Sequence, residues 1–216
     1  VGTGIALTAT DPAGNTSEFS QCVPLDPGAQ TFTVNSAADT DDGSCTAEPG
    51  GCTLREAIAA SNAHPGADKI AFNIAGGGVH VISLTSGLPT INFPVDIDGY
   101  TQPGSAPNTL AVGDNAAIRI QIDGLSASSS GTYGLGICSS DVSVRGFSFT
   151  HHRHAALAPG YTGSGSTCGG GLSGIVVAGN FVGLAPDGSV AGNQEFGIVA
   201  NGSVVRIGGI AAADRN

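Results

Sequence analysis

"CTLREAIAASN", residues 52–62, is the one stretch of this sequence that predicts an α-helix. Its apolar residues recur every three to four positions, and a threonine followed three residues later by a glutamate matches a capping box. We expect this helix to cover the first layer of a β structure, with its arginine and glutamate anchoring it there rather than facing solvent. The residues predicted for this role are Thr53, Leu54, Arg55, Glu56 and Ile58, in a helix over 53–62.

The rest of the chain has a β composition. Glycine makes up 35 of 216 residues, only 11% of residues are charged, and methionine and tryptophan are absent, which argues against a helix-rich fold. From residue 68 onward, short apolar or alternating runs such as "KIAFNI", "VSVRGFSFT" and "FGIVANG" stop at Gly, Asn, Asp or Pro. Such regular short runs predict an all-β solenoid, sandwich or barrel.

A loose internal repeat favours the solenoid. Gly-Ile-Val at 174–176 recurs at 197–199, an offset of 23 residues, which is about one coil of a parallel β-helix. One coil cannot bury its inward side chains alone, whereas coils stacked about 4.8 Å apart bury them continuously. Asparagines beside glycine, at Asn180, Asn193 and Asn201, suit left-handed corners. A sandwich is the alternative, but it does not explain a repeat of this length.

The net charge of −10, with one lysine and six arginines, excludes two classes of partner. Nucleic acid and anionic membranes both require a basic patch, which this composition does not supply. No apolar stretch approaches the roughly 18 to 20 residues needed to cross a bilayer. We therefore expect no nucleic-acid partner and no membrane insertion.

Five cysteines without a CxxC pair point to disulfides in an oxidising compartment rather than to zinc. Cys45 and Cys52 flank a turn-rich loop that can bring them together, and Cys138 and Cys168 flank a polar insertion. We predict these two bridges. Cys22 is then unpaired, or paired outside this chain.

The helix motif, "DDGSC" before it, and "GADKIAFNI", "LPTINFPVDIDGYTQPG", "GNFVGLAPDG" and "IGG…RN" after it form an ordered series. In this series the sequence resembles the CSLREAI-type domain of bacterial secreted and surface proteins, over roughly residues 30–216. The resemblance implies a right-handed parallel β-helix of pectate-lyase-like architecture. Thr53 stands where the family motif has serine, which keeps the capping hydroxyl.

The resemblance also implies how the chain is divided. Residues 1–25 look like the strand that closes such a domain, from a preceding repeat or available for strand exchange, and residues 26–216 look like a β-helix left open at its C-terminal side. The chain begins at Val1, so we expect a processed or excised piece of something longer. Adding the first strand to a neighbouring subunit or repeat would give a fibre by head-to-tail contacts.

Catalysis is the competing prediction, because many β-helices of this architecture cleave polysaccharides with paired carboxylates and a basic residue. Aspartate before glycine is, however, ordinary turn chemistry. Asp123, Asp141 and Arg119 are weaker candidates for such a site. The residues we consider for carbohydrate contact are Asp96, Asp98, Arg145, His152 and His154.

Two polar clusters are candidates for metal ligands. In "HHRH", residues 151–154, at most His152 and His154 can share a strand face, and an exposed turn leading into an insertion at 155–171 is the simpler interpretation. "DTDDG" superficially resembles a calcium loop but lacks the distal glutamate. Its candidate ligands are Asp39, Asp41 and Asp42.

We therefore expect a secreted or cell-surface protein without a cofactor, Ca²⁺ being the one candidate. Its expected function is structural and non-catalytic: an adhesive or filament-forming module whose partners are copies of itself or neighbouring repeats, with surface carbohydrate as a further partner. The alternative is a carbohydrate-active enzyme or a carbohydrate-binding module.

Overall fold

The computed structural model describes residues 4–5, 8–17, 23–24, 28–127 and 133–216. These residues are mostly β structure with one α-helix and two short 3-10 helices. The elements are β1 (Gly4–Ile5), β2 (Val23–Pro24), β3 (Thr31–Val34), α1 (Leu54–Ala63), β4 (Asp68–Phe72), β5 (His80–Ser83), β6 (Val95–Asp98), η1 (Gly99–Thr101), β7 (Ile120–Asp123), β8 (Leu135–Ile137), β9 (Val142–Arg145), β10 (Phe147–Thr150), β11 (Ala155–Pro159), β12 (Leu172–Val177), β13 (Phe181–Val182), β14 (Phe196–Ile198), β15 (Ser203–Ile207) and η2 (Ala212–Asp214).

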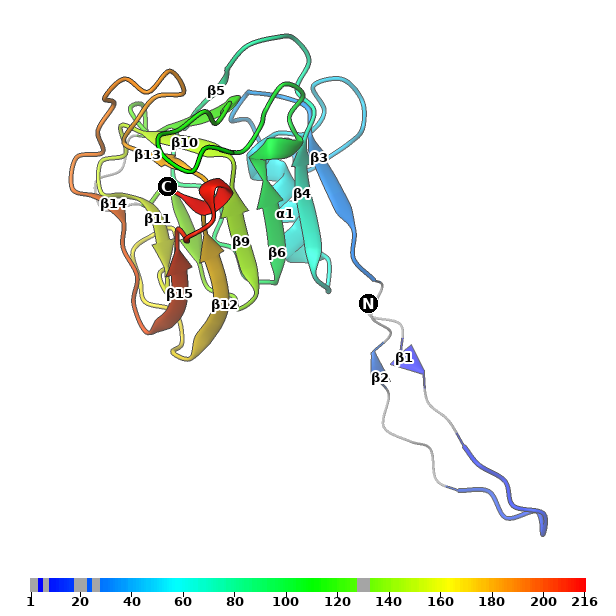
Figure 1. Cartoon of the computed structure of the whole chain (residues 1–216). Helices are drawn as coiled ribbons and strands as arrows, with labels where there is room; N and C mark the ends of the chain where they lie inside the picture. The colour runs from blue at the N-terminus through cyan, green and yellow to red at the C-terminus, as the bar shows by residue number, and fades with distance from the viewer. Residues whose placement is uncertain (1–3, 6–7, 18–22, 25–27, 128–132) are drawn as a thin grey trace.

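Three parallel sheets surround the core (Figure 1). The long sheet has the order β3-β4-β6-β9-β12-β15, the second sheet β5-β7-β10-β13, and the third sheet β8-β11-β14. From β6 onward the chain visits the long, second and third sheets in turn, three times, before it returns to the long sheet at β15. Among the described residues, none of the sheets closes on itself.

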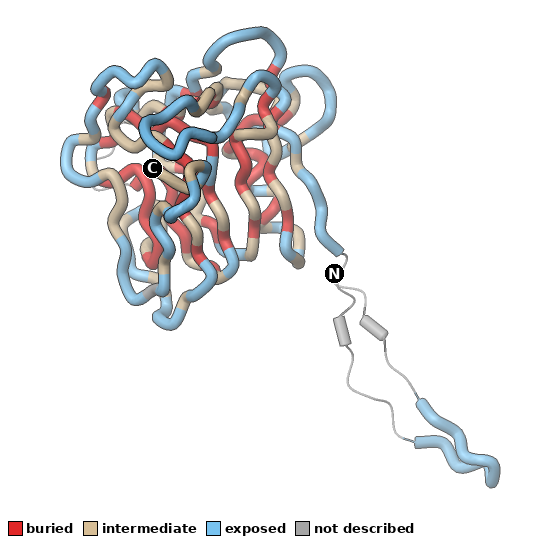
Figure 2. The backbone as a smooth tube through the Cα atoms, in the orientation of Figure 1, coloured by how far each residue is buried: buried red, intermediate tan, exposed pale blue. Residues whose placement is uncertain are grey.

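The core lies between the three sheets, where Figure 2 shows the buried backbone segments gathered. Strands of the long sheet alternate, as in β4, whose residues are alternately buried and partly exposed. The largest buried side chains include Phe72, Phe147 and Phe149. The ring centroid of Phe147 lies 5.3 Å from that of Phe72 and 5.7 Å from that of Phe149. The inward aliphatics of successive strands extend this cluster in both directions.

The predicted helix is confirmed, because α1 begins after Thr53 and has the complete capping box with Glu56. It packs against β3 and β4, with Leu54 and Ile58 buried in the core. Arg55 and Glu56 both anchor the helix, but they bond different partners and not each other. The Arg55 guanidinium donates to both carboxylate oxygens of Asp39, at 3.0 and 2.9 Å, and to the Gly87 carbonyl.

The Glu56 carboxylate accepts from the backbone N–H groups of Thr53 and Asp42, at 2.7 and 3.0 Å. These contacts attach the loop before the helix to its first turn.

Both predicted disulfides are present, Cys45–Cys52 with Cα atoms 4.2 Å apart and Cys138–Cys168 with Cα atoms 5.4 Å apart. The first ties the same loop to the start of the helix. Cys22 lies outside the described residues.

The predicted repeat of 23 residues is wrong. Ile175 of β12 pairs with Val205 of β15, an offset of 30, whereas the Gly-Ile-Val at 197–199 lies in the third sheet and pairs with β11. The two Gly-Ile-Val segments therefore belong to strands of two different sheets and do not mark successive turns of the chain. Glycine followed by an inward aliphatic recurs in more than one sheet, so this local pattern does not identify the sheet.

The asparagine corners are also corrected. Among the described non-glycine residues, positive φ occurs at Asp141 and His151 only. Asn180 instead uses its buried side chain as a bridge. Its oxygen accepts from the Phe147 N–H at 3.1 Å, and its nitrogen donates to the Val144 carbonyl at 2.9 Å.

The "HHRH" segment is not a wholly exposed turn, because His152 is buried. The expected insertion at 155–171 begins with β11, a strand whose five residues are all buried. Leu157 belongs to the central core cluster, whereas Ala155 and Ala158 belong to a second buried cluster with Tyr133. Both faces of β11 are covered, so the alternation that marks other strands is missing.

Candidate functional site

A cluster of charged side chains lies on the outer face of the long sheet. The strand register places Lys69, Asp96 and Ser143 side by side on β4, β6 and β9. Two residues further along, Asp98 of β6 lies beside Arg145 of β9. Because side chains alternate along a strand, all five project away from the core.

The cluster is held by ion pairs. The closest joins Arg145 Nη2 to Asp98 Oδ2 at 2.8 Å, and Lys69 Nζ lies 3.6 Å from the same oxygen. Asp96 is flanked by the same two cations at 4.0 and 3.8 Å, and its carboxylate accepts from the Ser143 hydroxyl. Asp98 is nearly buried, whereas Asp96 and Arg145 are substantially exposed. The exposed pairs add little stability, because water screens them.

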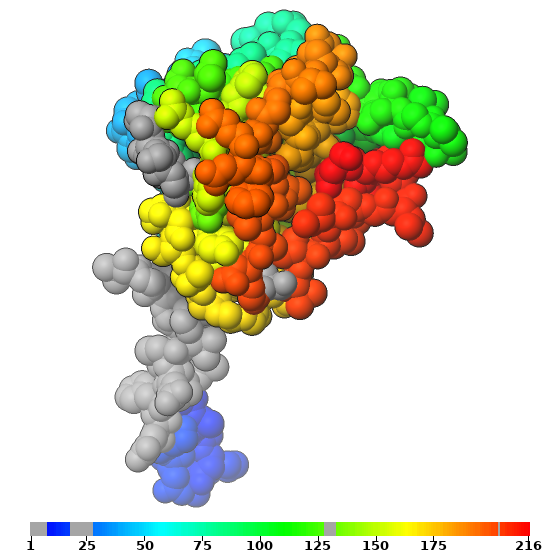
Figure 3. Space-filling model, turned by 90° about the vertical axis from the view of Figure 1, so that its left-hand side faces the viewer, coloured from blue at the N-terminus to red at the C-terminus, as the bar shows by residue number. Residues whose placement is uncertain are grey.

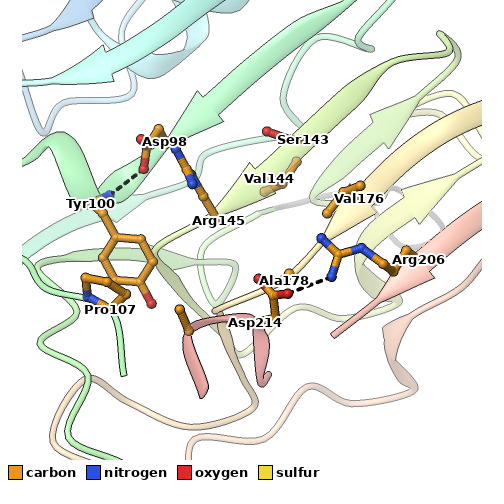
Figure 4. Close-up of a pocket in the computed structure, with 11 residues that line it drawn as sticks. Asp98, Tyr100, Pro107, Ser143, Val144, Arg145, Val176, Ala178, Arg206 and Asp214 are labelled. Atoms are coloured by element: carbon orange, nitrogen blue, oxygen red, sulfur yellow. Dashed lines mark hydrogen bonds and ion pairs between the residues drawn. The ribbon is translucent and has the colours of Figure 1, made fainter. Parts of the chain in front are cut away.

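A cleft of about 410 Å³ opens beside this cluster (Figure 4). One wall carries Asp98 and Arg145, and the facing wall carries Arg206 of β15 with Asp214 of η2, whose ion pair is 2.9 Å long. Between the walls lie small apolar residues. The residues lining the cleft are Asp98, Tyr100, Pro107, Ser143, Val144, Arg145, Val176, Ala178, Arg206, Ala213 and Asp214.

The C-terminal segment helps to build this cleft. Arg215 donates to the carbonyl oxygens of Leu110, Ala111 and Gly113 in the loop after β6, the shortest bond being 2.6 Å. The side chain of Asn216 donates to the Val177 carbonyl at 2.9 Å. The segment after β15 therefore folds back across the long sheet and joins the loop on the opposite wall.

Tyr100 contributes a fixed phenol to the cleft. Burial, with the nearby charges of Asp114 and Asp98, raises the pKa of Tyr100 to about 12, against a smaller opposing effect of Arg145. Its hydroxyl donates to the Gly179 carbonyl at 2.6 Å. The phenol thus stays protonated at neutral pH and serves as a hydrogen-bond donor rather than as a base.

The polar groups of the cleft are partly engaged with one another. Asp98 accepts from Arg145 and from the Tyr100 backbone N–H. What remains available are donors on two guanidinium groups and the exposed Asp96, beside an apolar floor. Such a surface offers donors and acceptors to a polyhydroxylated or otherwise uncharged polar ligand.

The sequence-predicted carbohydrate residues are only partly brought together. Asp96, Asp98 and Arg145 lie together, but His152 and His154 do not line the cleft. His152 is packed in the core near Phe149, and its backbone N–H donates to Asn193. Both histidines lie in the turn before β11, as the sequence favoured, but His152 is buried rather than exposed.

His154 belongs to a separate cluster at the corner between the second and third sheets. Its Nδ1 bonds the Glu195 carboxylate, and its Nε2 lies 3.2 Å from the Tyr133 hydroxyl. The arrangement resembles a carboxylate, a base and a hydroxyl in series. Burial raises the pKa of Tyr133, with Tyr161 and Glu195 adding to it, so the hydroxyl is not activated as a nucleophile.

The acidic run at 39–43, a candidate for calcium ligands, is engaged within the protein. Asp39 is engaged by Arg55 and by the Thr85 hydroxyl, while Asp41 and Asp42 accept from the backbone N–H groups of Gly43 and Ser44. Within the described residues, no group of three or more His, Cys, Asp or Glu side chains could hold a metal ion. The acidic run is instead turn structure that supports the helix.

The weaker candidates lie apart from the cleft. Asp123 pairs with His151 at 2.7 Å; burial raises the pKa of Asp123, but hydrogen bonds from His151, Leu125 and Thr150 outweigh it, so the pKa is lowered overall. Arg119 donates to the Gly104 carbonyl at 3.2 Å. Asp141 borders a shallower groove together with Asp96.

Sequence reasoning missed four members of the site: Lys69, Tyr100, Arg206 and Asp214. Tyr100 and Lys69 stand within a few residues of strands that were recognised, so only the strand register could have indicated their position. Arg206 and Asp214 come from the last strand and the segment after it. No local signal connects them with Asp98, more than a hundred residues earlier.

Comparisons with known proteins add no relative: no family model, no curated protein and no solved structure matches this chain. The helices among the described residues are too short or too polar to span a bilayer. The similarity to the CSLREAI-type domain accordingly stays a prediction from the sequence motifs.

Proposed function

We propose that this chain is an extracellular, non-catalytic structural or adhesive module with the architecture of a right-handed parallel β-helix, and that copies of it join into filaments by strand addition. The regular visits to three parallel sheets support the architecture, and right-handed crossovers are the rule for parallel strands. The two disulfides are typical of an oxidising, extracellular environment.

The observation that carries the proposal is the N-terminal hairpin. β1 pairs with β2 in antiparallel fashion, in a sheet of its own. Residues 8–17 are all exposed, and Figure 1 shows them well away from the three parallel sheets. An isolated two-stranded hairpin is marginally stable in water, so strands placed in this way gain most by pairing with another sheet.

Removal of residues 1–25 tests the proposal. The full chain should form filaments visible by electron microscopy, and the shortened chain should stay monomeric. All residues of the buried core cluster lie at Val34 or beyond, so the urea midpoint of the shortened chain should be unchanged. A monomeric full chain at high concentration, or filaments from the shortened chain, would contradict the proposal.

A peptide control separates strand pairing from other effects of the deletion. A synthetic peptide of residues 1–25 with Cys22→Ser, added in excess to the full chain, should compete for the acceptor and shorten the filaments. A peptide of the same composition in scrambled order should leave filament length unchanged.

A carbohydrate-active enzyme or carbohydrate-binding module is the second candidate, and the convergence of Asp96, Asp98 and Arg145 beside the cleft favours it. Planar carboxylate and guanidinium groups can each bond adjacent hydroxyls of a sugar, while its C–H face packs on the apolar floor. Since Asp98 already accepts from Arg145, and Asp96 from the Ser143 hydroxyl, we place binding above cleavage.

Arg145→Met tests this second function. Loss of a charge-assisted donor should weaken binding of a neutral oligosaccharide by about tenfold or more in calorimetric titrations. Arg153→Met, at an exposed residue outside the cleft, is the matched control and should leave binding unchanged. No binding of any member of a neutral oligosaccharide panel by the unmodified chain would exclude this candidate.

A further inference from the structure

The two ends of the stacked strands differ in how the core is covered. At the end that contains β3, α1 lies over the core, with Leu54 and Ile58 buried and Val34 of β3 also buried. At the other end, β13, β14 and β15 are each the last strand of a sheet, paired on one side only among the described residues. We call the surface formed by β13, β14 and β15 the open end.

Register partners show that the core is incompletely covered at the open end. Ile207 of β15 is 51% exposed, although Val177, its partner one strand further in, is fully buried. The same contrast holds in all three sheets. The buried partners are Phe149, Leu157 and Ile175, and the partly exposed residues beside them are Val182, Ile198 and Val205, respectively.

No described segment covers this end. The chain after β15 turns back over the long sheet toward the loop at 110–113 instead of adding a layer. Figure 3 looks onto the open end, and the late residues of the chain, orange to red, make up much of that face. Phe196 of β14 and Val204 of β15 add exposed apolar surface there. Free strand edges combined with exposed core residues are a template for pairing with another chain.

We infer that the open end is the acceptor for the N-terminal hairpin of a second copy, an inference that rests on the proposed filament function. The sequence of the N-terminal segment has apolar residues at alternate positions, Ile5 and Leu7, and such a pattern suits a strand that covers exposed core residues. Residues 1–27 contain Asp11, Glu18 and Asp26 but no lysine or arginine, so a negative charge added at the open end should repel them.

This contact joins two different surfaces, the hairpin of one copy and the open end of the next. A heterologous contact of this kind can be repeated from copy to copy. It produces a filament when the rotation between successive copies does not close a ring. The capped end cannot serve as the acceptor in the same way, because α1 already covers its core residues.

Ile207→Glu in the full chain tests the acceptor. A carboxylate among the exposed core residues should repel the acidic hairpin and raise the protein concentration needed for filaments at least tenfold, as measured by sedimentation. The side chain is half exposed, so the urea midpoint should stay unchanged. Val112→Glu, in a loop on another surface at 88% exposure, is the matched control and should assemble normally.

The outcomes separate this inference from the proposed function. Normal assembly of Ile207→Glu, in a chain whose filaments depend on residues 1–25, would overturn the acceptor while the filament function stands. If the unmodified chain forms no filaments, the proposed function fails. Should Ile207→Glu fold poorly, Val204→Glu in the same strand replaces it, because the Val204 side chain is 73% exposed and has little packing to lose, and normal assembly of that variant counts equally against the acceptor.

Discussion

Replacing Phe147 with alanine should lower the free energy of unfolding by about 3 to 5 kcal/mol, the range for truncating a buried aromatic residue. The Phe147 ring is fully buried and lies between Phe72 and Phe149, so its removal leaves a cavity that neighbouring rings on two sheets cannot fill without moving. Urea unfolding followed by circular dichroism, without reducing agent, measures the change.

Phe93→Ala is the control for this prediction. Phe93 is 41% exposed, so its truncation should cost well under half as much. A protein of this kind can unfold in more than one step. The free energies to compare between the two variants are then those of the transition in which β10 unfolds. A loss below about 1 kcal/mol for Phe147→Ala would mean that the aromatic series is not the centre of the core.

The strands of the long sheet could be predicted because each has one buried and one solvent-facing side. The burial of β4 alternates residue by residue, with Ile70 and Phe72 buried and Lys69 partly exposed. β11 could not be predicted, because "AALAP" is buried on both faces and contains alanine and proline, which are poor markers of a strand. Its burial depends on Tyr133 and on the third sheet, which no local pattern reveals.

The helix illustrates the opposite case, in which local chemistry suffices. Thr53 and Glu56 form a capping box within a single turn, so four residues of sequence contain the whole interaction. The partner of Arg55 could not be predicted in the same way. Asp39 lies in a loop 16 residues earlier, and only the fold brings it to the helix.

The candidate site was predictable in its centre and not in its extent. Asp96 and Asp98 are two residues apart in the sequence, so they share a strand face. Arg145 reaches them because β6 and β9 pair with an offset of 47, as in Ile97 with Val144, although 23 was expected. The positions of Lys69 and Arg206 also depend on which residues pair between neighbouring strands. They could not be predicted without that register.

Acidification from pH 6.5 to pH 4 should remove about 3 kcal/mol of stability through His152 alone. Burial lowers the pKa of His152 to about 4, against smaller raising effects of a hydrogen bond to the Ile122 backbone and of the Asp123 charge, while His151 lowers it further. In the unfolded chain the imidazole takes up a proton near pH 6.5. The folded chain does not do so until about pH 4, so stability is complete above pH 6.5 and falls across this window.

His152→Leu tests the assignment, because leucine keeps an apolar side chain against Phe149 but has no titratable group. Its urea midpoint should fall much less between pH 6.5 and 4 than that of the unmodified chain. His151→Gln removes a neighbouring imidazole that is 39% exposed and should retain the steep fall. Equal pH dependence in His152→Leu and in the unmodified chain would show that the acid sensitivity arises elsewhere. The difference between the two variants therefore isolates the cost of a proton on one imidazole enclosed by the core.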